Sequence, residues 1–221
     1  EFKQAKEKFM RKFTLEDMKG FYVADGVIQC PSGDYSLIKA FTELCSFAED
    51  CSFAEWCSFA KRCSFAKRCS FAEDCSFAKG CSFAEWCSFA KGCSFAKRCS
   101  FAERCSFAKG CSFAEWCSFA KACSFAEWCS FAKECSFAEW CSFANNCSVC
   151  DNKLKGFKMR SISGLGKHKR TLYVWDTVNG FWVQAGCFFG GVDELTNSVI
   201  NKYGANHSYI KAVEFLTSDW G

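Results

Sequence analysis

The residues best suited to chemistry are twenty-one cysteines and two histidines, in a chain of 221 residues. Cys147 and Cys150 have the two-residue spacing of half a zinc knuckle, and a tetrahedral site needs a second pair of ligands. No second pair follows at that spacing, because only Cys187, His168 and His207 remain. We therefore expect no metal and no other cofactor.

Cys187 lies in Gly186-Cys187-Phe188-Phe189-Gly190, which resembles the catalytic Gly-Cys-Phe-Trp-Gly of peptide methionine sulfoxide reductases. The resemblance implies a reactive thiol, for which His207 would be the base. That family's catalytic domain is much larger than the 34 residues that follow Cys187, and Phe189 replaces its Trp. We favour a half-buried cysteine at the end of a strand, and keep thiol chemistry as a third hypothesis.

Positive charge is concentrated in one place. Residues 153–170 contain seven basic groups and no acidic group, whereas the formal charge of the whole chain is +4. Such a segment could bind phosphates or an acidic partner. We favour a solvated linker of strand and loop. The basic residues are Lys153, Lys155, Lys158, Arg160, Lys167, Lys169 and Arg170.

The element that must position these groups is a repeat. Residues 45–152 contain eighteen hexads, of which seventeen read Cys-Ser-Phe-Ala-x-x without change. On a helix, successive Phe side chains would lie ~240° apart and form three stripes. On a strand, Cys and Phe point to one side and Ser to the other. Each hexad is thus predicted to be a short strand and a bend, stacked as a β-solenoid. Its predicted core includes Phe47, Phe65, Phe83, Phe101, Cys45, Cys63 and Cys81.

Read as Phe-Ala-x-x-Cys-Ser, the repeat resembles the hexapeptide motif of left-handed parallel β-helices. Phe replaces the usual aliphatic residue and Cys the usual small residue. The resemblance covers residues 45–152 and implies a left-handed, three-sided coil of about six turns. Enzymes of that family need His between their coils, and residues 45–152 contain none. We therefore expect a protein that is not an enzyme.

The charges indicate how many hexads close one turn. The first free position is Glu or Lys in every hexad from Glu49 to Glu139. With three hexads per turn, residues 18 apart stack, and eight of 13 such pairs have opposite signs. With two hexads per turn the spacing is 12, and only five of 14 pairs do. Because like charges directly opposite destabilise a sheet, three hexads per turn are favoured.

Tryptophan occupies the second free position of five hexads, always after Glu. On three faces these side chains scatter over all edges, and Arg68 and Arg104 would flank Trp86 in a cation–π arrangement. Exposed Trp is favoured at interfaces, although packing along an edge explains it as well. The candidates for partner binding are Trp86, Trp116, Trp128 and Trp140, with Trp56 on the same pattern.

The open end of a solenoid exposes backbone and Phe, so residues 1–44 are expected to form a cap. Residues 3–13 alternate basic and apolar groups as a short amphipathic helix would. Residues 21–29 read as extended chain around an Asp25-Gly26 turn. Tyr35 and Phe41 fall in the Phe register, which predicts degenerate hexads from about residue 33.

Residues 153–221 are expected to form a linker and a second cap. Strands over 171–178 and 181–189 flank Asn179-Gly180, a type I′ turn signal. Helices should follow over 193–203 and from an N-cap at Asn206. This unit is similar to C-terminal modules of uncharacterised bacterial and phage repeat proteins, a resemblance that implies no activity.

The leading hypothesis is a structural or interaction protein: a rigid scaffold that presents a C-terminal module to a protein partner. Self-assembly as a homo-oligomer or filament fits the uniform repeats. The alternative is binding of nucleic acid or another polyanion through residues 153–170. No run of ~18 apolar residues that could span a membrane occurs. Because the cysteines follow the repeat rather than a loop framework, we expect a reducing, cytoplasmic setting.

Overall fold

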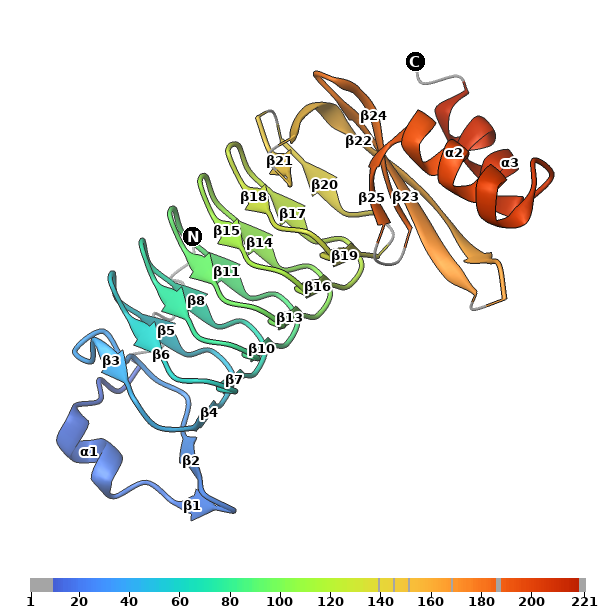
Figure 1. Ribbon diagram of the computed structural model, residues 1–221. Coiled ribbons are helices and arrows are strands. Elements are labelled where there is room, and N and C mark those ends of the chain that lie inside the picture. The colour runs from blue at the N-terminus through green and yellow to red at the C-terminus, as the bar shows by residue number, and fades with distance from the viewer. Residues whose placement is uncertain are drawn as a thin grey trace, which may run out of the picture.

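The structure is a computed structural model that describes residues 10–138, 140–144, 146–150, 152–167, 169–185 and 188–218. Of Asn152, Lys153 and residues 155–158 it describes only the backbone. The chain forms a parallel β-solenoid of about seven turns, followed by an antiparallel sheet and two helices (Figure 1). The predicted mainly-β solenoid is confirmed. Its left hand stays a prediction of the resemblance.

The solenoid has three flat sides, each a parallel sheet to which every turn adds one short strand. The first face comprises β2 (Val27–Cys30), β4 (Cys45–Phe47), β7 (Ser64–Phe65), β10 (Ser82–Phe83), β13 (Ser100–Phe101), β16 (Ser118–Phe119) and β19 (Ser136–Phe137). The second face comprises β5 (Ser52–Phe53), β8 (Ser70–Phe71), β11 (Ser88–Phe89), β14 (Ser106–Phe107), β17 (Ser124–Phe125) and β20 (Ser142–Phe143). The third face comprises β3 (Ala40–Phe41), β6 (Ser58–Phe59), β9 (Ser76–Phe77), β12 (Ser94–Phe95), β15 (Ser112–Phe113), β18 (Ser130–Phe131) and β21 (Ser148–Val149).

Residues 18 apart pair in register on every face. Phe83 lies opposite Phe65 in the turn before it and Phe101 in the turn after it. Three hexads therefore close one turn, as the charges predicted. The backbone continues this pairing beyond the strands: the amide of Ala84 donates to the carbonyl of Phe65 at 2.9 Å.

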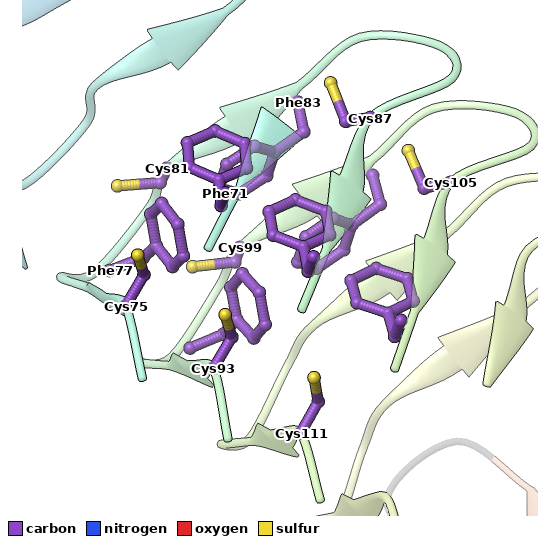
Figure 2. Close-up of a cluster of buried hydrophobic side chains, with 14 of the residues drawn as sticks. Phe71, Cys75, Phe77, Cys81, Phe83, Cys87, Cys93, Cys99, Cys105 and Cys111 are labelled. Atoms are coloured by element: carbon purple, nitrogen blue, oxygen red, sulfur yellow. The ribbon is translucent and has the colours of Figure 1, made fainter. Parts of the chain in front are cut away.

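Phenylalanine rings fill the centre of the rod in three parallel columns (Figure 2). Phe65 and Phe83 stack with ring centroids 4.8 Å apart and planes 4° from parallel. Phe77 meets Phe83 edge to face at 5.0 Å. Offset stacks and edge-to-face contacts are the arrangements that aromatic rings favour, so the three columns hold one another in place. The core positions predicted from the hexad are buried, with Phe65 at 2% and Cys63 at 0% exposure.

Each described corner places its second free residue in the left-handed backbone region. Positive φ angles recur at this position all along the rod. The angle is +61° at Asp50 near one end and +64° at Asn146 near the other. Glycine adopts this region without strain, and it fills the position at Gly80, Gly92 and Gly110. Every other residue type pays a conformational cost there.

Replacing Ala122 by Gly is expected to raise the free energy of unfolding by about 1 kcal/mol, because Ala122 holds a φ of +59° that disfavours a Cβ. The reverse change is available at the same kind of corner. Gly110 has a φ of +76° and no atom within 4 Å of an added Cβ, so Gly110→Ala isolates the backbone effect. Guanidinium titration should give opposite signs for the two variants; a loss of stability in both would refute the argument.

Most of the helix predicted over residues 3–13 falls on residues 1–9, which lie outside the described part. Residues 10–13 are not helical, and the helix α1 is Leu15–Lys19. Thr14 caps it: its hydroxyl accepts from the amide of Asp17, and Asp17 accepts from the amide of Thr14 at 2.8 Å. This Thr-x-x-Asp capping box is a start signal that the alternation of charges obscured.

The degenerate first turn is confirmed. β1 (Val23–Ala24) and β2 form a hairpin around Asp25 and Gly26, and both turn residues have positive φ. The ring of Tyr35 stacks on Phe53, which lies 18 residues further along, at 5.5 Å. Phe13 stacks on the other side of Tyr35 at 5.0 Å and ends that column.

The C-terminal module is a four-stranded antiparallel sheet under two helices. Its strands are β22 (Asn152–Leu165), β23 (Arg170–Thr177), β24 (Gly180–Ala185) and β25 (Phe188–Gly191), and its helices are α2 (Val192–Tyr203) and α3 (Ser208–Thr217). The predicted turn at Asn179-Gly180 joins β23 to β24. The segment expected to be a linker of strand and loop is mostly the strand β22. One expectation was wrong: His207, not Asn206, is the N-cap of α3.

The sheet of this module closes the C-terminal end of the rod. Alternation along β23 turns Leu172 and Val174 to the helices, while Trp175 packs on the rod. The indole of Trp175 is buried and meets Phe137 edge to face at 6.4 Å. Gln184 donates from Nε2 to the carbonyl of Cys135 at 3.1 Å. The core of the rod therefore extends onto the near side of the module's sheet, and the far side of that sheet forms a second core with the helices.

Candidate interaction surfaces

The structure divides the basic segment into parts with different roles. The guanidinium of Arg160 donates to the carbonyls of Ser218 at 2.6 Å and Leu216 at 3.3 Å, at the end of α3. A cation there satisfies carbonyls that a helix end leaves without partners. Arg160 therefore has a structural role. The side chains of Lys153, Lys155 and Lys158 lie outside the described residues.

The remaining three cations cluster at the turn between β22 and β23. Lys167, Lys169 and Arg170 are exposed there. Gly166, with φ of +64°, brings this turn against α3: a Cβ at Gly166 would lie 3.5 Å from the ring of Tyr209. The turn and the start of α3 thus form one surface.

Three stacked rings complete this surface, and the sequence analysis did not find them. His207 stacks between Tyr203 and Tyr209, with centroids 4.8 Å and 5.3 Å away. The ammonium of Lys202 lies 5.3 Å from the centroid of Tyr203. Burial raises the pKa of Tyr209. In the sequence, the only sign of this stack of rings was a run of aromatic residues at the junction of the two predicted helices. We call Lys167, Lys169, Arg170, Lys202 and the three rings the basic tip.

The tryptophans lie on corners of the rod, as predicted. Trp86, Trp116 and Trp128 are 52%, 50% and 52% exposed, and Trp140 is 78% exposed. Arg104 covers the ring of Trp86 at 4.8 Å, which confirms one half of the predicted cation–π arrangement. The other half was wrong. Arg68 turns to the previous turn of the rod, where it binds Asp50 and Glu49.

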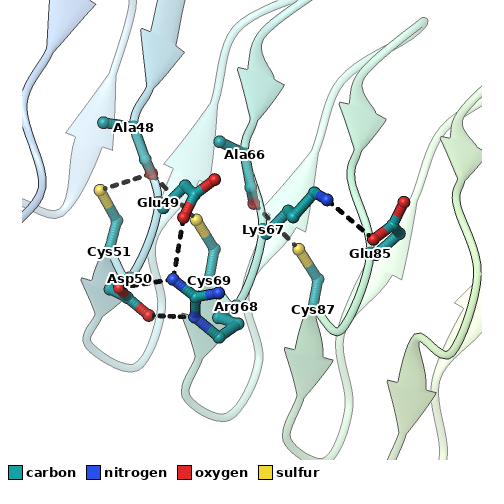
Figure 3. Close-up of polar contacts among 10 residues, drawn as sticks. All are labelled: Ala48, Glu49, Asp50, Cys51, Ala66, Lys67, Arg68, Cys69, Glu85 and Cys87. Atoms are coloured by element: carbon teal, nitrogen blue, oxygen red, sulfur yellow. Dashed lines mark hydrogen bonds and ion pairs between the residues drawn. The ribbon is translucent and has the colours of Figure 1, made fainter.

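Ion pairs between successive turns line the corners (Figure 3). Arg68 donates to Asp50 at 2.7 Å and to Glu49 at 2.8 Å, and Lys67 lies 3.0 Å from Glu85. On another corner a hydrogen bond from Lys97 lowers the pKa of Glu115. These pairs are exposed, so solvent screens each of them and each contributes little to stability. They favour the three-hexad register.

The cysteines form three columns beside the rings (Figures 2 and 3). From Cys51 to Cys147, each thiol of the repeat donates to a backbone carbonyl, as Cys69 does to Ala48 at 3.4 Å and Cys87 to Ala66 at 3.4 Å. Every cysteine of the described part is a free thiol. The interaction with the stacked thiol of an adjacent turn, together with burial, raises the pKa of Cys57, Cys63 and Cys81. These thiols are packing groups.

Native protein is expected to keep its central cysteines unmodified by iodoacetamide at pH 8. Thiolate is the reactive form of cysteine. Raised pKa values keep the thiols of residues such as Cys63 and Cys81 protonated, and close packing keeps the reagent away from them. Peptide mapping should find them alkylated only in guanidinium. Cys150 is partly exposed and serves as the internal positive control. Rapid labelling of Cys63 in folded protein would contradict the packing role.

Of the two cysteine motifs singled out in the sequence, the structure describes only the one that contains Cys147 and Cys150. Cys147 belongs to the repeat and donates to the carbonyl of Ala126 at 3.2 Å. Within the described ranges, no three side chains of His, Cys, Asp or Glu come together as a metal site requires. Cys187 lies outside the described residues, so its thiol chemistry stays a prediction from the sequence.

A hollow of about 450 Å³ opens at the N-terminal end of the rod. Met18 and Phe21 line it from the cap, and Ile28 and Phe41 from the first turn. Leu15 and Val23 at its rim are 62% and 55% exposed. Nothing in the sequence indicated this hollow, because its walls come from four separate segments.

Comparisons with protein-family models, with curated proteins and with solved structures gave no match. Among the helices of the described ranges, none has the length and apolar character needed to cross a membrane.

Proposed function

We propose that this protein is a non-enzymatic structural scaffold, in which a rigid solenoid holds the C-terminal module for a protein partner. The observation that carries the proposal is the continuous core of the rod, which reaches one side of the module's sheet. Three columns of stacked rings run from Phe13 to Phe143, and the end of the rod joins the module through Trp175. A core without a break along its length gives the chain no hinge between the two caps.

Rigidity is the property to test. Spin labels carried by non-canonical residues at Leu37 and Val178, both exposed, should give one narrow distance distribution in dilute protein. Because the labels need no cysteine, the buried thiols stay intact. A broad or bimodal distribution, with an unchanged circular dichroism spectrum, would show a hinge and overturn the scaffold.

The second candidate function is binding of nucleic acid or another polyanion, now centred on the basic tip. Three exposed cations beside stacked rings favour it, since phosphates bind cations and bases stack on aromatic rings. Replacing Lys167, Lys169 and Arg170 by Gln should abolish anisotropy changes with a labelled oligothymidylate. The matched control replaces Lys61, Lys79 and Lys97, three exposed lysines of the rod. Binding that ignores salt, or that the control weakens equally, would exclude the basic tip.

A further inference from the structure

The charges on the corners also alternate in sign across each face of the rod. First free positions six residues apart have opposite signs in 12 of 15 cases between Glu49 and Glu139. Residues six apart lie at opposite edges of one face, roughly 17 Å from each other by the rise of a strand. The same alternation gives opposite signs to stacked residues 18 apart within one chain. Residues six apart are beyond ion-pair contact in that chain, so they could pair only across an interface with a second copy.

We infer that the second face is a dimer interface, on which a second copy of this chain packs with its rod parallel and the two copies related by a two-fold axis along the rods. This deepens the proposed scaffold and rests on it. Such an axis lays each corner of one copy against the opposite corner of the same turn in the other copy. Residues six apart in sequence, which cannot meet within one chain, then become neighbours across the interface.

The charges across the second face complement one another under this symmetry. At the first free position, four of the five turns between Glu49 and Glu127 bring together opposite signs. Glu103 meets Lys109 of the second copy, and Lys109 meets its Glu103. At the second free position, Arg68 meets Asp74. Only the lowest turn, with Glu49 and Glu55, opposes like charges.

Side-chain sizes also match across this face. Trp86 of one copy lies opposite Gly92 of the other, and Trp128 lies opposite Ala122. Asp74 reaches over Gly92, which places a carboxylate where an indole N–H could donate. Four of the five corner tryptophans belong to the edges of this face, and Trp116 is the exception. Two of these four tryptophans therefore face a Gly or an Ala, while Trp56 faces Asp50 and Trp140 faces Asn146.

The second face is also the side of the rod that is best suited to flat contact. Its six strands are all repeat strands, whereas cap strands extend the sheets of the other two faces (Figure 1). On the first face, the same symmetry would oppose Arg62 to Arg68 and Arg98 to Arg104.

The size of the face sets the strength of the dimer. Six turns at ~4.8 Å and a width of roughly 17 Å give about 500 Å² per copy, or about 1,000 Å² in total. This is the low end of the range for specific interfaces, so we expect a dissociation constant on the order of micromolar.

A charge swap tests the proposal by sedimentation equilibrium at 1 to ~200 µM protein. Glu103→Lys creates two like-charge contacts in the dimer and should weaken it at least ~10-fold. Glu103→Lys with Lys109→Glu restores opposite signs and should return the affinity to within ~3-fold of the original. In one copy, each of these residues has one acidic and one basic neighbour above and below it, so reversal leaves the contacts within the rod balanced.

Tryptophan variants identify the face. Trp86→Ala should weaken the dimer at least ~10-fold, and Trp116→Ala, which removes an equally exposed ring from another corner, should leave it unchanged. A chain that stays monomeric at ~200 µM, a double variant that melts normally without restored affinity, or dependence on Trp116 in place of Trp86 would each overturn the proposal. A monomer that still gives a narrow spin-label distance would keep the scaffold and exclude only the dimer.

Discussion

Deletion of Ser106 alone is expected to destabilise the protein more than deletion of the whole turn 99–116. Cys105 and Phe107 point inward because one residue separates them along the strand. Without Ser106 they become adjacent, and one of them must leave the core. The loss of a buried Phe together with the hydrogen bond from the Ser106 amide to the Cys87 carbonyl should lower the free energy of unfolding by at least about 4 kcal/mol.

The longer deletion removes one complete turn and leaves the pattern of the remaining hexads unchanged. With residues 99–116 removed, Arg98 runs into Cys117, and each later hexad keeps its face. The expected loss is the share of 18 residues in the total stability, about 1–3 kcal/mol. The two variants are compared by guanidinium titration followed by circular dichroism. A deletion of 99–116 that costs more than the loss of Ser106 would show that turns are not interchangeable.

Replacing Phe95 by Ala is expected to lower the free energy of unfolding by ~3–5 kcal/mol. Phe95 is 3% exposed and stacks between Phe77 and Phe113, each at 4.8 Å. It also meets Phe89 and Phe101 edge to face at 5.0 Å. Backbone ladders fix the spacing of the turns, so the rod cannot collapse onto the cavity, which places the cost in the upper part of the usual range.

The matched control for this prediction is Phe215→Ala. Phe215 lies on α3 and is 70% exposed, so the same truncation there should change stability by less than about 0.5 kcal/mol. Chemical denaturation of both variants gives the comparison. Equal losses at Phe95 and Phe215 would mean that the columns of rings contribute no more than exposed apolar surface.

Much of the solenoid could be predicted from the sequence because one short rule repeats. The alternation of Cys, Ser and Phe sets the inside and the outside, and the signs of the Glu and Lys residues identify the 18-residue register. Each signal is weak in one hexad and strong in eighteen. Tyr35 and Phe41 could be placed for the same reason, since they keep the register where the rest of the hexad is lost.

Outside the repeat each error has its own physical cause. The strand β22 was expected to cover only part of its segment, because Lys155, Gly156 and Lys158 do not alternate in polarity; β23 offers the whole segment an edge to pair with. The helix α1 begins at a capping box that lies beyond the segment expected to be helical. Trp175 gave no hint of its role, because the end of the rod that it covers exists only in three dimensions.

The candidate surfaces divide in the same way. Corner positions follow from the repeat, so the exposure of the tryptophans could be predicted. The basic tip could not, because it joins a turn at Lys167 to rings near His207 that are some 40 residues away in sequence. Arg160 looked like its neighbours in sequence and differs from them only because a helix ends beside it.

Because one turn holds three hexads, the number of hexads sets a direction as well as a length. One additional hexad would move the C-terminal module about 1.6 Å along the axis and swing it by a third of a revolution relative to the N-terminal cap. Three additional hexads would move it ~4.8 Å and leave its bearing unchanged. Duplications within the gene can therefore rotate the module about the rod axis in steps of 120°, or move it along the axis without rotation. The same hexad encodes both outcomes.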